Sequence, residues 1–119
     1  MSYVDGFVLV VPKKKLALYK KIARKAGKIW REYGAIDYVE CLGDDVKPGK
    51  WTSFPQAVKL KAGEAVVFSW IVYKSRRDRD RINAKVMKDK RLASMMDPKN
   101  LPFDGKRMFW GGFRVVVDL

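Results

Sequence analysis

The sequence predicts an α+β sandwich in which an antiparallel four-stranded sheet carries two helices on one face. Three observations lead to this fold class. The hydrophobic spacing changes between segments typical of strands and segments typical of helices, their order is β-α-β-β-α-β, and Gly or Pro stands at several boundaries. This order is that of the ferredoxin-like sandwich. The chain has 119 residues, and we expect one domain, residues 1–119, with a modest core.

The N-terminal half predicts a strand, a long helix and a second strand. Residues 3–11, YVDGFVLVV, are rich in Val and Phe and end at a proline, which is typical of a strand. Residues 13–33 predict a helix, because apolar residues recur every three or four positions while most lysines and arginines fall on the other side. Gly34 is placed to end this helix, and residues 35–42, AIDYVECL, predict the second strand.

The C-terminal half predicts a hairpin, a second helix and a final strand. Residues 57–61, AVKLK, alternate like a short exposed strand, and a turn joins them to a main strand at residues 65–74. Ser75 predicts the N-cap of the second helix, whose narrow apolar stripe continues as far as Met95. Residues 107–117, RMFWGGFRVVV, predict the last strand.

Two consecutive glycines, Gly111 and Gly112, interrupt the last predicted strand. A Gly pair at such a position predicts a β-bulge that bends the strand, or a close approach by a ligand or another backbone. We favour the bulge. The preceding stretch 103–107, FDGKR, contains one Gly and lacks the spacing of a phosphate-binding loop.

The main strands are apolar on both faces. Side chains alternate across a strand, so one set normally faces water. In the third strand one side carries Val67, Ser69, Ile71 and Tyr73, and the other carries Val66, Phe68, Trp70 and Val72. An uncovered face of this kind exceeds the roughly 300–600 Å² that soluble monomers expose, and covering it is worth about 10 kcal/mol per subunit before association costs. We therefore expect a homodimer in which two sheets pack together.

The composition excludes several kinds of chemistry. The chain has no histidine, which excludes a Ser-His-Asp triad, a histidine general base and histidine-ligated zinc or haem. Its single cysteine, Cys41, leaves no internal disulfide and argues against a thiolate zinc site. We expect no metal and no cofactor, so any catalysis would depend on carboxylates, Lys, Tyr or Cys41.

The N-terminal segment and the hydropathy predict a cytoplasmic protein that does not associate with membranes. No apolar run approaches the ~20 residues needed to span a bilayer. The first 15 residues, MSYVDGFVLVVPKKK, carry their basic charges after the apolar stretch and an Asp where a signal peptide has Lys or Arg. We interpret this segment as the first strand.

Five stretches of the chain together resemble the YbaA-like family of proteins of unknown function: 1-MSYVDGFV-8, 26-AGKIWREYGAIDYVEC-41, 67-VFSWIVYKS-75, 83-NAKVM-87 and 103-FDGKRMFWGGF-113. The resemblance covers essentially the whole chain. It implies the dimeric α/β-barrel class of the ferredoxin-like fold, in which two sheets form one barrel, and it implies no activity. The wider superfamily includes haem-degrading enzymes, which use a histidine ligand that this chain lacks, and cofactor-free monooxygenases.

Acidic residues inside the predicted strands are candidate catalytic groups. A carboxylate within a sheet is costly unless it is paired or faces water. On a functional interpretation, Asp5 or Glu40 is a desolvated base in a ligand cavity between the sheets. The candidate cavity residues are Tyr38, Trp70, Trp110 and Arg114. On the structural interpretation, which we favour, the acids pair with basic residues, namely Arg107, Arg114 or Lys74.

The first predicted helix is strongly basic, within a chain of formal net charge +13. Its candidate polyanion-binding residues are Lys20, Lys21, Arg24, Lys25 and Lys28. Such a run suits RNA, although most charge runs are simply solvated faces. The run 75-SRRDRDR-81 alternates acids with arginines, which is typical of a solvated helix.

Three functions follow from these observations. The leading interpretation is a homodimer that binds a small, partly apolar ligand, with the chain itself and that ligand as partners. The second is a cofactor-free, monooxygenase-like enzyme that uses Asp5 or Glu40 as a base. The third is RNA binding through the first helix, which we rank last.

Overall fold

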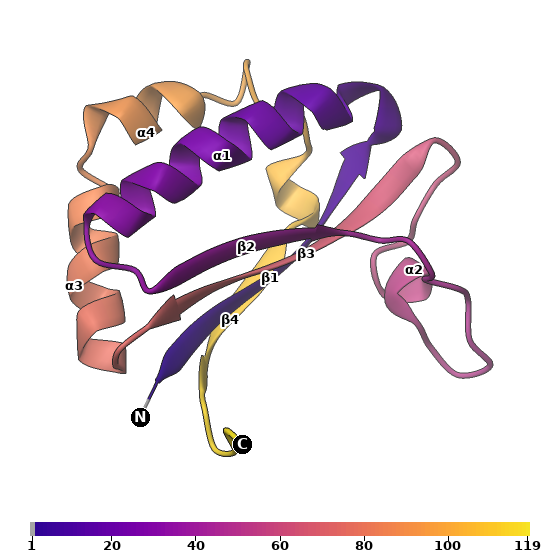
Figure 1. The fold of residues 1–119 in the computed structure, drawn as a ribbon. Helices are drawn as coiled ribbons and strands as arrows, with labels where there is room; N and C mark the ends of the chain where they lie inside the picture. The colour runs from indigo at the N-terminus through magenta and orange to yellow at the C-terminus, as the bar shows by residue number, and fades with distance from the viewer. Residues whose placement is uncertain (1) are drawn as a thin grey trace.

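The computed structural model describes residues 2–119. Figure 1 shows a twisted sheet with its main helices gathered on one side and a small helix on an extended loop. The elements are β1 (Tyr3–Pro12), a 3₁₀ turn η1 (Lys13–Lys15), α1 (Leu16–Glu32), β2 (Asp37–Leu42), α2 (Phe54–Ala57), β3 (Glu64–Tyr73), α3 (Arg76–Val86), α4 (Lys90–Met95), a 3₁₀ turn η2 (Gly105–Arg107) and β4 (Phe109–Arg114).

The sheet confirms the predicted ferredoxin-like fold class. Its four strands lie in the order β2-β3-β1-β4, and every neighbouring pair is antiparallel. The helices α1, α3 and α4 cover the same face of this sheet (Figure 1). We call this the helix face and the opposite one the outer face. The central strands β1 and β3 pair along their whole length, from Tyr3 opposite Tyr73 to Pro12 opposite Glu64.

The long helix α1 forms where the hydrophobic spacing predicts it. Its buried residues include Tyr19, Ala23, Ala26 and Ile29, which recur at helical spacing and face the sheet. The lysines and arginines between them are exposed. Gly34 has φ = 115°, a left-handed conformation that favours glycine, and its N–H bonds to the carbonyl of Arg31 as the helix ends.

Two short helices replace the single helix predicted from Ser75 to Met95. Ser75 is the N-cap of α3, as predicted, and its Oγ accepts a hydrogen bond from the N–H of Asp78 at 3.1 Å. Helix α3 ends after Val86. Asp89 is then the N-cap of α4, because its side chain accepts a hydrogen bond from the N–H of Arg91. A second N-cap inside the apolar stripe therefore breaks the helix in two.

The exposed strand predicted at residues 57–61 is wrong. Instead, Ser53 is the N-cap of α2. Its Oγ accepts a hydrogen bond from the N–H of Gln56 at 3.2 Å. Lys59 follows with φ = 51°, which is incompatible with a strand. The segment turns back so that Val58 packs against the outer face near the C-terminal end of β1, in a cluster with Val8, Val10 and Val66.

The last strand is shorter than predicted and contains no bulge, so the bulge expected at Gly111 and Gly112 is wrong. β4 pairs with β1 residue for residue, from Tyr3 opposite Arg114 to Val8 opposite Phe109. The glycines instead leave room for rings. A Cβ on Gly112 would lie 2.4 Å from the hydroxyl oxygen of Tyr3, while a Cβ on Gly111 would touch the Phe113 ring at 3.7 Å.

The core lies between the sheet and the helices. The buried residues of this layer are Leu9, Val11, Tyr19, Ala23, Ala26, Ile29, Ala35, Val67, Ile71, Tyr73, Ile82, Val86 and Leu92. Among residues 2–119, no helix is long and apolar enough to cross a membrane.

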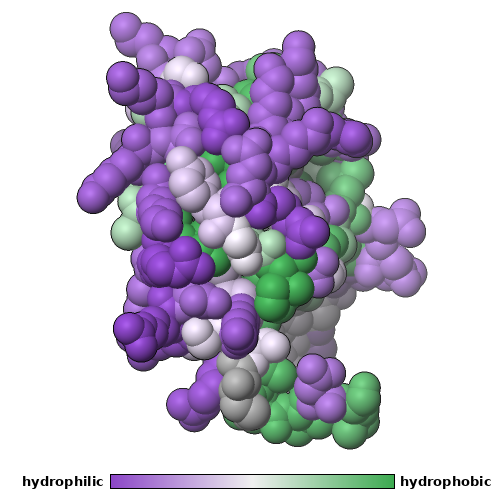
Figure 2. All heavy atoms as spheres, turned by 60° about the vertical axis from the view of Figure 1, so that its left-hand side comes forward, coloured by the Kyte–Doolittle hydropathy of each residue, from purple (hydrophilic) through white to green (hydrophobic). Residues whose placement is uncertain are grey.

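Much of the outer face is apolar and open. Phe68 of β3 is 43% exposed, and Phe109 and Phe113 of β4 are 51% and 62% exposed. The C-terminal residues after β4 add Val116 and Val117, which are also exposed. Figure 2 shows hydrophilic side chains over the upper part of one side, where the helices lie, and hydrophobic atoms gathered toward its lower end. The helices therefore leave one apolar surface of the sheet uncovered.

Candidate functional site

A cavity of about 120 Å³ lies between the helix face of the sheet and α1. Strands β1 and β3 form its floor, α1 its roof, and α4 with the chain that follows closes one end. Its lining is Phe7, Leu9, Tyr19, Ile22, Ala23, Ala26, Trp30, Tyr38, Glu40, Ser69, Trp70, Ile71, Leu92, Met96, Leu101, Phe103 and Met108. Glu40 is the single carboxylate in this lining, and Ser69, its neighbour across β2 and β3, is a further polar residue among mostly apolar and aromatic side chains.

Glu40 is held by two tyrosine hydroxyls. The hydroxyl of Tyr19 in α1 donates to Oε1 at 2.6 Å, and that of Tyr38 in β2 donates to Oε2 at 2.9 Å. Burial, with the charge of Glu40 second, raises the pKa of Tyr19 and of Tyr38 well above the usual range. Both phenols therefore remain protonated donors, and the three side chains form a polar end to the cavity.

Gly27 permits α1 to approach β2 closely enough to build this site. A Cβ at Gly27 would lie 2.6 Å from the Tyr38 ring, so no larger residue fits without a shift. The ring of Trp30, also in α1, packs against Tyr38 with ring centroids 6.0 Å apart, and its Nε1 donates to Asn83 at 2.9 Å. Gly27 and Trp30 of α1 and the hydrogen bond to Glu40 thus fix the position of Tyr38, and Asn83 of α3 fixes Trp30 in turn.

Asp5, the other candidate base, does not line the cavity. Arg79 of α3 donates from Nη1 to its Oδ1 at 2.7 Å, and Asn83 donates to its Oδ2 at 3.3 Å. Burial raises the pKa of Asp5, and the charge of Arg79 opposes that shift. The basic partner comes from α3, whereas the sequence suggested Arg107, Arg114 or Lys74; Arg107 bonds to Glu64 instead.

Of the four remaining candidate cavity residues, two line the cavity and two do not. Tyr38 and Trp70 contribute to the lining, although the Trp70 ring also lies 5.6 Å from the ring of Phe68 on the outer face. Trp110 and Arg114 are exposed residues of β4 and do not contribute. The Trp110 ring stacks on Phe7 at a centroid distance of 6.0 Å.

The five basic candidates of α1 are all exposed, and three of them line a groove beside the cavity. This groove, of about 1020 Å³, runs between α1 and the edge strand β2. Lys20, Arg24 and Lys28 line it, whereas Lys21 and Lys25 lie outside it. Within residues 2–119, none of the five lies within ion-pair distance of a carboxylate.

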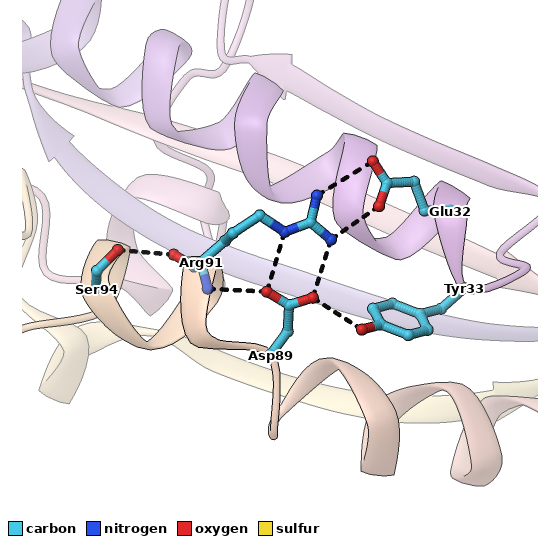
Figure 3. Close-up of polar contacts among 5 residues, drawn as sticks. All are labelled: Glu32, Tyr33, Asp89, Arg91 and Ser94. Carbon is cyan, nitrogen blue, oxygen red and sulfur yellow. Dashed lines mark hydrogen bonds and ion pairs between the residues drawn. The ribbon is translucent and has the colours of Figure 1, made fainter.

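A polar cluster that the sequence did not reveal holds α4 against α1 (Figure 3). Arg91 donates to Asp89 from Nη2 at 2.9 Å and to Glu32 of α1 at 2.8 Å, and Tyr33 donates to the same Asp89 at 2.8 Å. The hydrogen bonds from Arg91 and Tyr33 hold the pKa of Asp89 well below its usual range. Because Leu92 and Met96 line the cavity, this cluster positions one of its walls.

The segment after α4 is a part of the site that was not predicted from the sequence. Leu101, Phe103 and Met108 complete the lining. An interrupting FDG turn with large apolar residues on both sides was the available signal. In the part of the chain that is described, no group of three acidic or cysteine side chains is placed to hold a metal ion.

The strand order and the helices on one face of the sheet are those of a ferredoxin-like fold, and solved structures share this arrangement. A NIPSNAP domain protein from Burkholderia xenovorans aligns with a TM-score of 0.55 and 13% identity, over 96% of this chain and 94% of its own. A putative antibiotic biosynthesis monooxygenase from Nitrosomonas europaea aligns with a TM-score of 0.53 and 13% identity, over 94% and 88%. At such low identity these likenesses show the fold alone.

The sequence matches a narrower group. Residues 2–105 match the model of a protein family, DUF1428, whose description is 'protein of unknown function'. The uncharacterised proteins YbaA of Escherichia coli K12 and of Shigella flexneri are both 48% identical over 118 residues, which is 99% of this chain and 99% of each relative. The chain belongs to the DUF1428 family, as its YbaA-like stretches indicated.

Proposed function

We propose that this protein is a homodimer that binds a small, mainly apolar molecule in the cavity between the sheet and α1. The observation that carries the proposal is the cavity itself, an apolar and aromatic space with Glu40, Tyr19 and Tyr38 at one end. Ligand sites are typically concave, mostly apolar and provided with a few polar groups that orient the ligand.

The size of the cavity indicates the size of its ligand. An apolar protein cavity of about 150 Å³ remains dry and accepts benzene. At about 120 Å³, this cavity suits one ring or a chain of similar length. Each oxygen of Glu40 accepts one tyrosine hydrogen bond and retains a lone pair, so a ligand hydroxyl or N–H has an acceptor there.

Filling the cavity tests this proposal. Toluene should shift the NMR signals of the methyl groups of Leu9 and Ile71 in the wild-type protein. Ala26→Leu, which inserts apolar atoms into the lining, should abolish those shifts, whereas Ala93→Leu on the exposed side of α4 should preserve them. Equal toluene binding by both variants would remove the cavity as the ligand site.

The homodimer is supported by the outer face. Inward from the strand ends, its side chains are apolar or glycine, including Val4, Val39, Val72 and the exposed Phe68. A second copy of the chain is the occupant that fits, because an uncharged face complements itself through a two-fold axis. The helices α1, α3 and α4 cannot provide this cover, since they lie on the other side of the sheet, and α2 with Val58 covers only one end of the outer face.

The same cavity supports proton transfer as a second candidate function. Glu40 is the carboxylate in contact with the space, whereas Asp5 is bonded to Arg79 and Asn83. The two tyrosine hydroxyls already donate to the two oxygens of Glu40, so the carboxylate is placed as a hydrogen-bond acceptor. This arrangement favours ligand binding over catalysis. Turnover that Glu40→Gln abolishes, with ligand affinity unchanged, would establish the enzymatic alternative.

A further inference from the structure

The basic groove and the apolar cavity share one wall. Tyr19, Ala23, Tyr38 and Glu40 line both spaces. The Tyr19–Glu40–Tyr38 cluster therefore stands where the apolar space meets the charged one. A ligand that entered the cavity beside this cluster would leave its other end in the groove.

The groove presents cations from one stripe of α1. Lys20, Arg24, Lys28 and Arg31 line it, at positions four, four and three residues apart. Residues at this spacing lie above one another on a helix surface. The side chain of Arg31 donates to the carbonyl of Ala35 at 3.1 Å, whereas the other three have no ion-pair partner among the residues described. Their charges are thus available to a ligand.

Three carboxylates also line the groove, and their situations differ. Glu32 forms an ion pair with Arg91 at 2.8 Å, and Glu40 accepts bonds from the two tyrosines. Asp37 is exposed at the start of β2. With Glu32 engaged, four cations face Asp37 and Glu40, so the groove retains an excess of positive charge.

From this juxtaposition we infer that the ligand is an amphiphilic anion, with a short apolar chain or ring in the cavity and a carboxylate or phosphate head in the groove. This inference rests on the proposed function. Glu40 sets the direction of entry, because its negative charge repels an anionic head from the cavity interior. Lys20 and Arg24 attract that head on the outer side, in a chain whose formal charge is +13.

Three probes of equal chain length separate charge from apolar contact. Octanoate, octanol and octylammonium carry the same apolar chain, whose inner part fills the cavity of about 120 Å³ while the rest lies toward the groove. Calorimetry on the wild-type protein therefore compares their heads. Octanoate should bind most tightly and octylammonium most weakly. Raising NaCl from about 0.05 M to about 0.5 M should weaken octanoate and leave octanol unchanged, because salt screens exposed charges. Octyl phosphate then shows whether a carboxylate or a phosphate head is preferred.

A matched pair of variants locates the effect. Lys20→Gln/Arg24→Gln should weaken octanoate by about five- to tenfold and leave octanol unchanged. Lys50→Gln/Lys85→Gln removes the same charge from exposed positions outside the groove and should leave both affinities near wild type. Circular dichroism confirms that each variant is folded, which is expected because all four residues are exposed.

The outcomes separate this inference from the proposal on which it rests. If octanol binds and octanoate binds no more tightly, or if both double variants lose octanoate equally, the anion site is wrong and the apolar cavity stands. If no probe binds and toluene does not bind, the cavity fails as a ligand site and the anion site fails with it.

Discussion

Arg79 of α3 and Asp5 of β1, 74 positions apart in the chain, form an ion pair of 2.7 Å at the side of the core. Asp5 is 1% exposed, and Asn83 donates to its second oxygen. The guanidinium of Arg79 lies 4.9 Å from the centroid of the Tyr3 ring. The pair therefore joins the helix layer to the sheet. Arg79 also pairs with Asp80 at 2.7 Å, whereas Asp5 has no second cation among residues 2–119.

Removal of one partner should be costly. Arg79→Met leaves the carboxylate of Asp5 buried without its cation, and we expect the free energy of unfolding at pH 7 to fall by about 3–5 kcal/mol. Urea denaturation measures the loss. Arg81→Met is the control, because Arg81 is 48% exposed and lies 3.6 Å from Asp78, and its loss should stay below about 1 kcal/mol. Equal losses would contradict a structural role for the Asp5 pair.

Gly27→Ala should destabilise the protein although alanine favours helices. The substitution gains about 1 kcal/mol of helix propensity, but its Cβ lies 2.6 Å from the Tyr38 ring. Overpacking at a buried contact costs about 1–3 kcal/mol, so we expect a net loss of about 1 kcal/mol in chemical denaturation and a displaced Tyr38. Gly105→Ala has no atom within 4 Å of its new Cβ and should be neutral. A stabilised Gly27→Ala variant would show that α1 is free to move away from β2.

The cluster around Asp89 should contribute to stability at neutral pH and lose that contribution in acid. The pKa of Asp89 is lowered in the folded protein by Arg91 and Tyr33, so folding favours its ionised form. Its contribution is full above about pH 5, where an unfolded Asp is ionised, and falls as the pH drops through the folded pKa.

Asp89→Asn tests this pH dependence. The difference in unfolding free energy between wild type and variant, measured with urea from about pH 7 to about pH 2, should shrink as the pH falls. Asp44→Asn changes an exposed loop residue that has no ion pair among residues 2–119, and its difference should be small at every pH. A difference for Asp89→Asn that stayed constant with pH would argue against the ion-pair origin.

A charge placed on the outer face should separate the subunits. Phe68→Lys introduces a cation into the centre of the apolar face, and we expect the variant to sediment as a monomer where the wild type sediments as a dimer. Leu18→Lys, at a residue of similar exposure on α1, should remain dimeric. A wild-type protein that is monomeric at micromolar concentration would remove the homodimer from the proposal.

Local patterns predicted most of the elements and missed those that depend on competing caps. Strand alternation and helical spacing located β1, α1, β2 and β3 to within a few residues. The break at Asp89 and the short helix after Ser53 were missed. In each case a side-chain cap changes the local backbone structure, while the spacing of apolar residues in the sequence stays the same. The Gly111 and Gly112 pair was misread because rings from other positions occupy the space above the glycines.

By itself, the sequence determined the ferredoxin-like fold class, the two apolar faces of the sheet and the absence of histidine chemistry. These follow from periodicity and composition, which are properties of the chain read in order. Only the tertiary structure distinguished Asp5 from Glu40, two strand carboxylates that point toward the same helix layer. Folding places Arg79 beside Asp5 and two tyrosines with an apolar space beside Glu40. The chemistry of a buried carboxylate is set by partners that are distant in sequence.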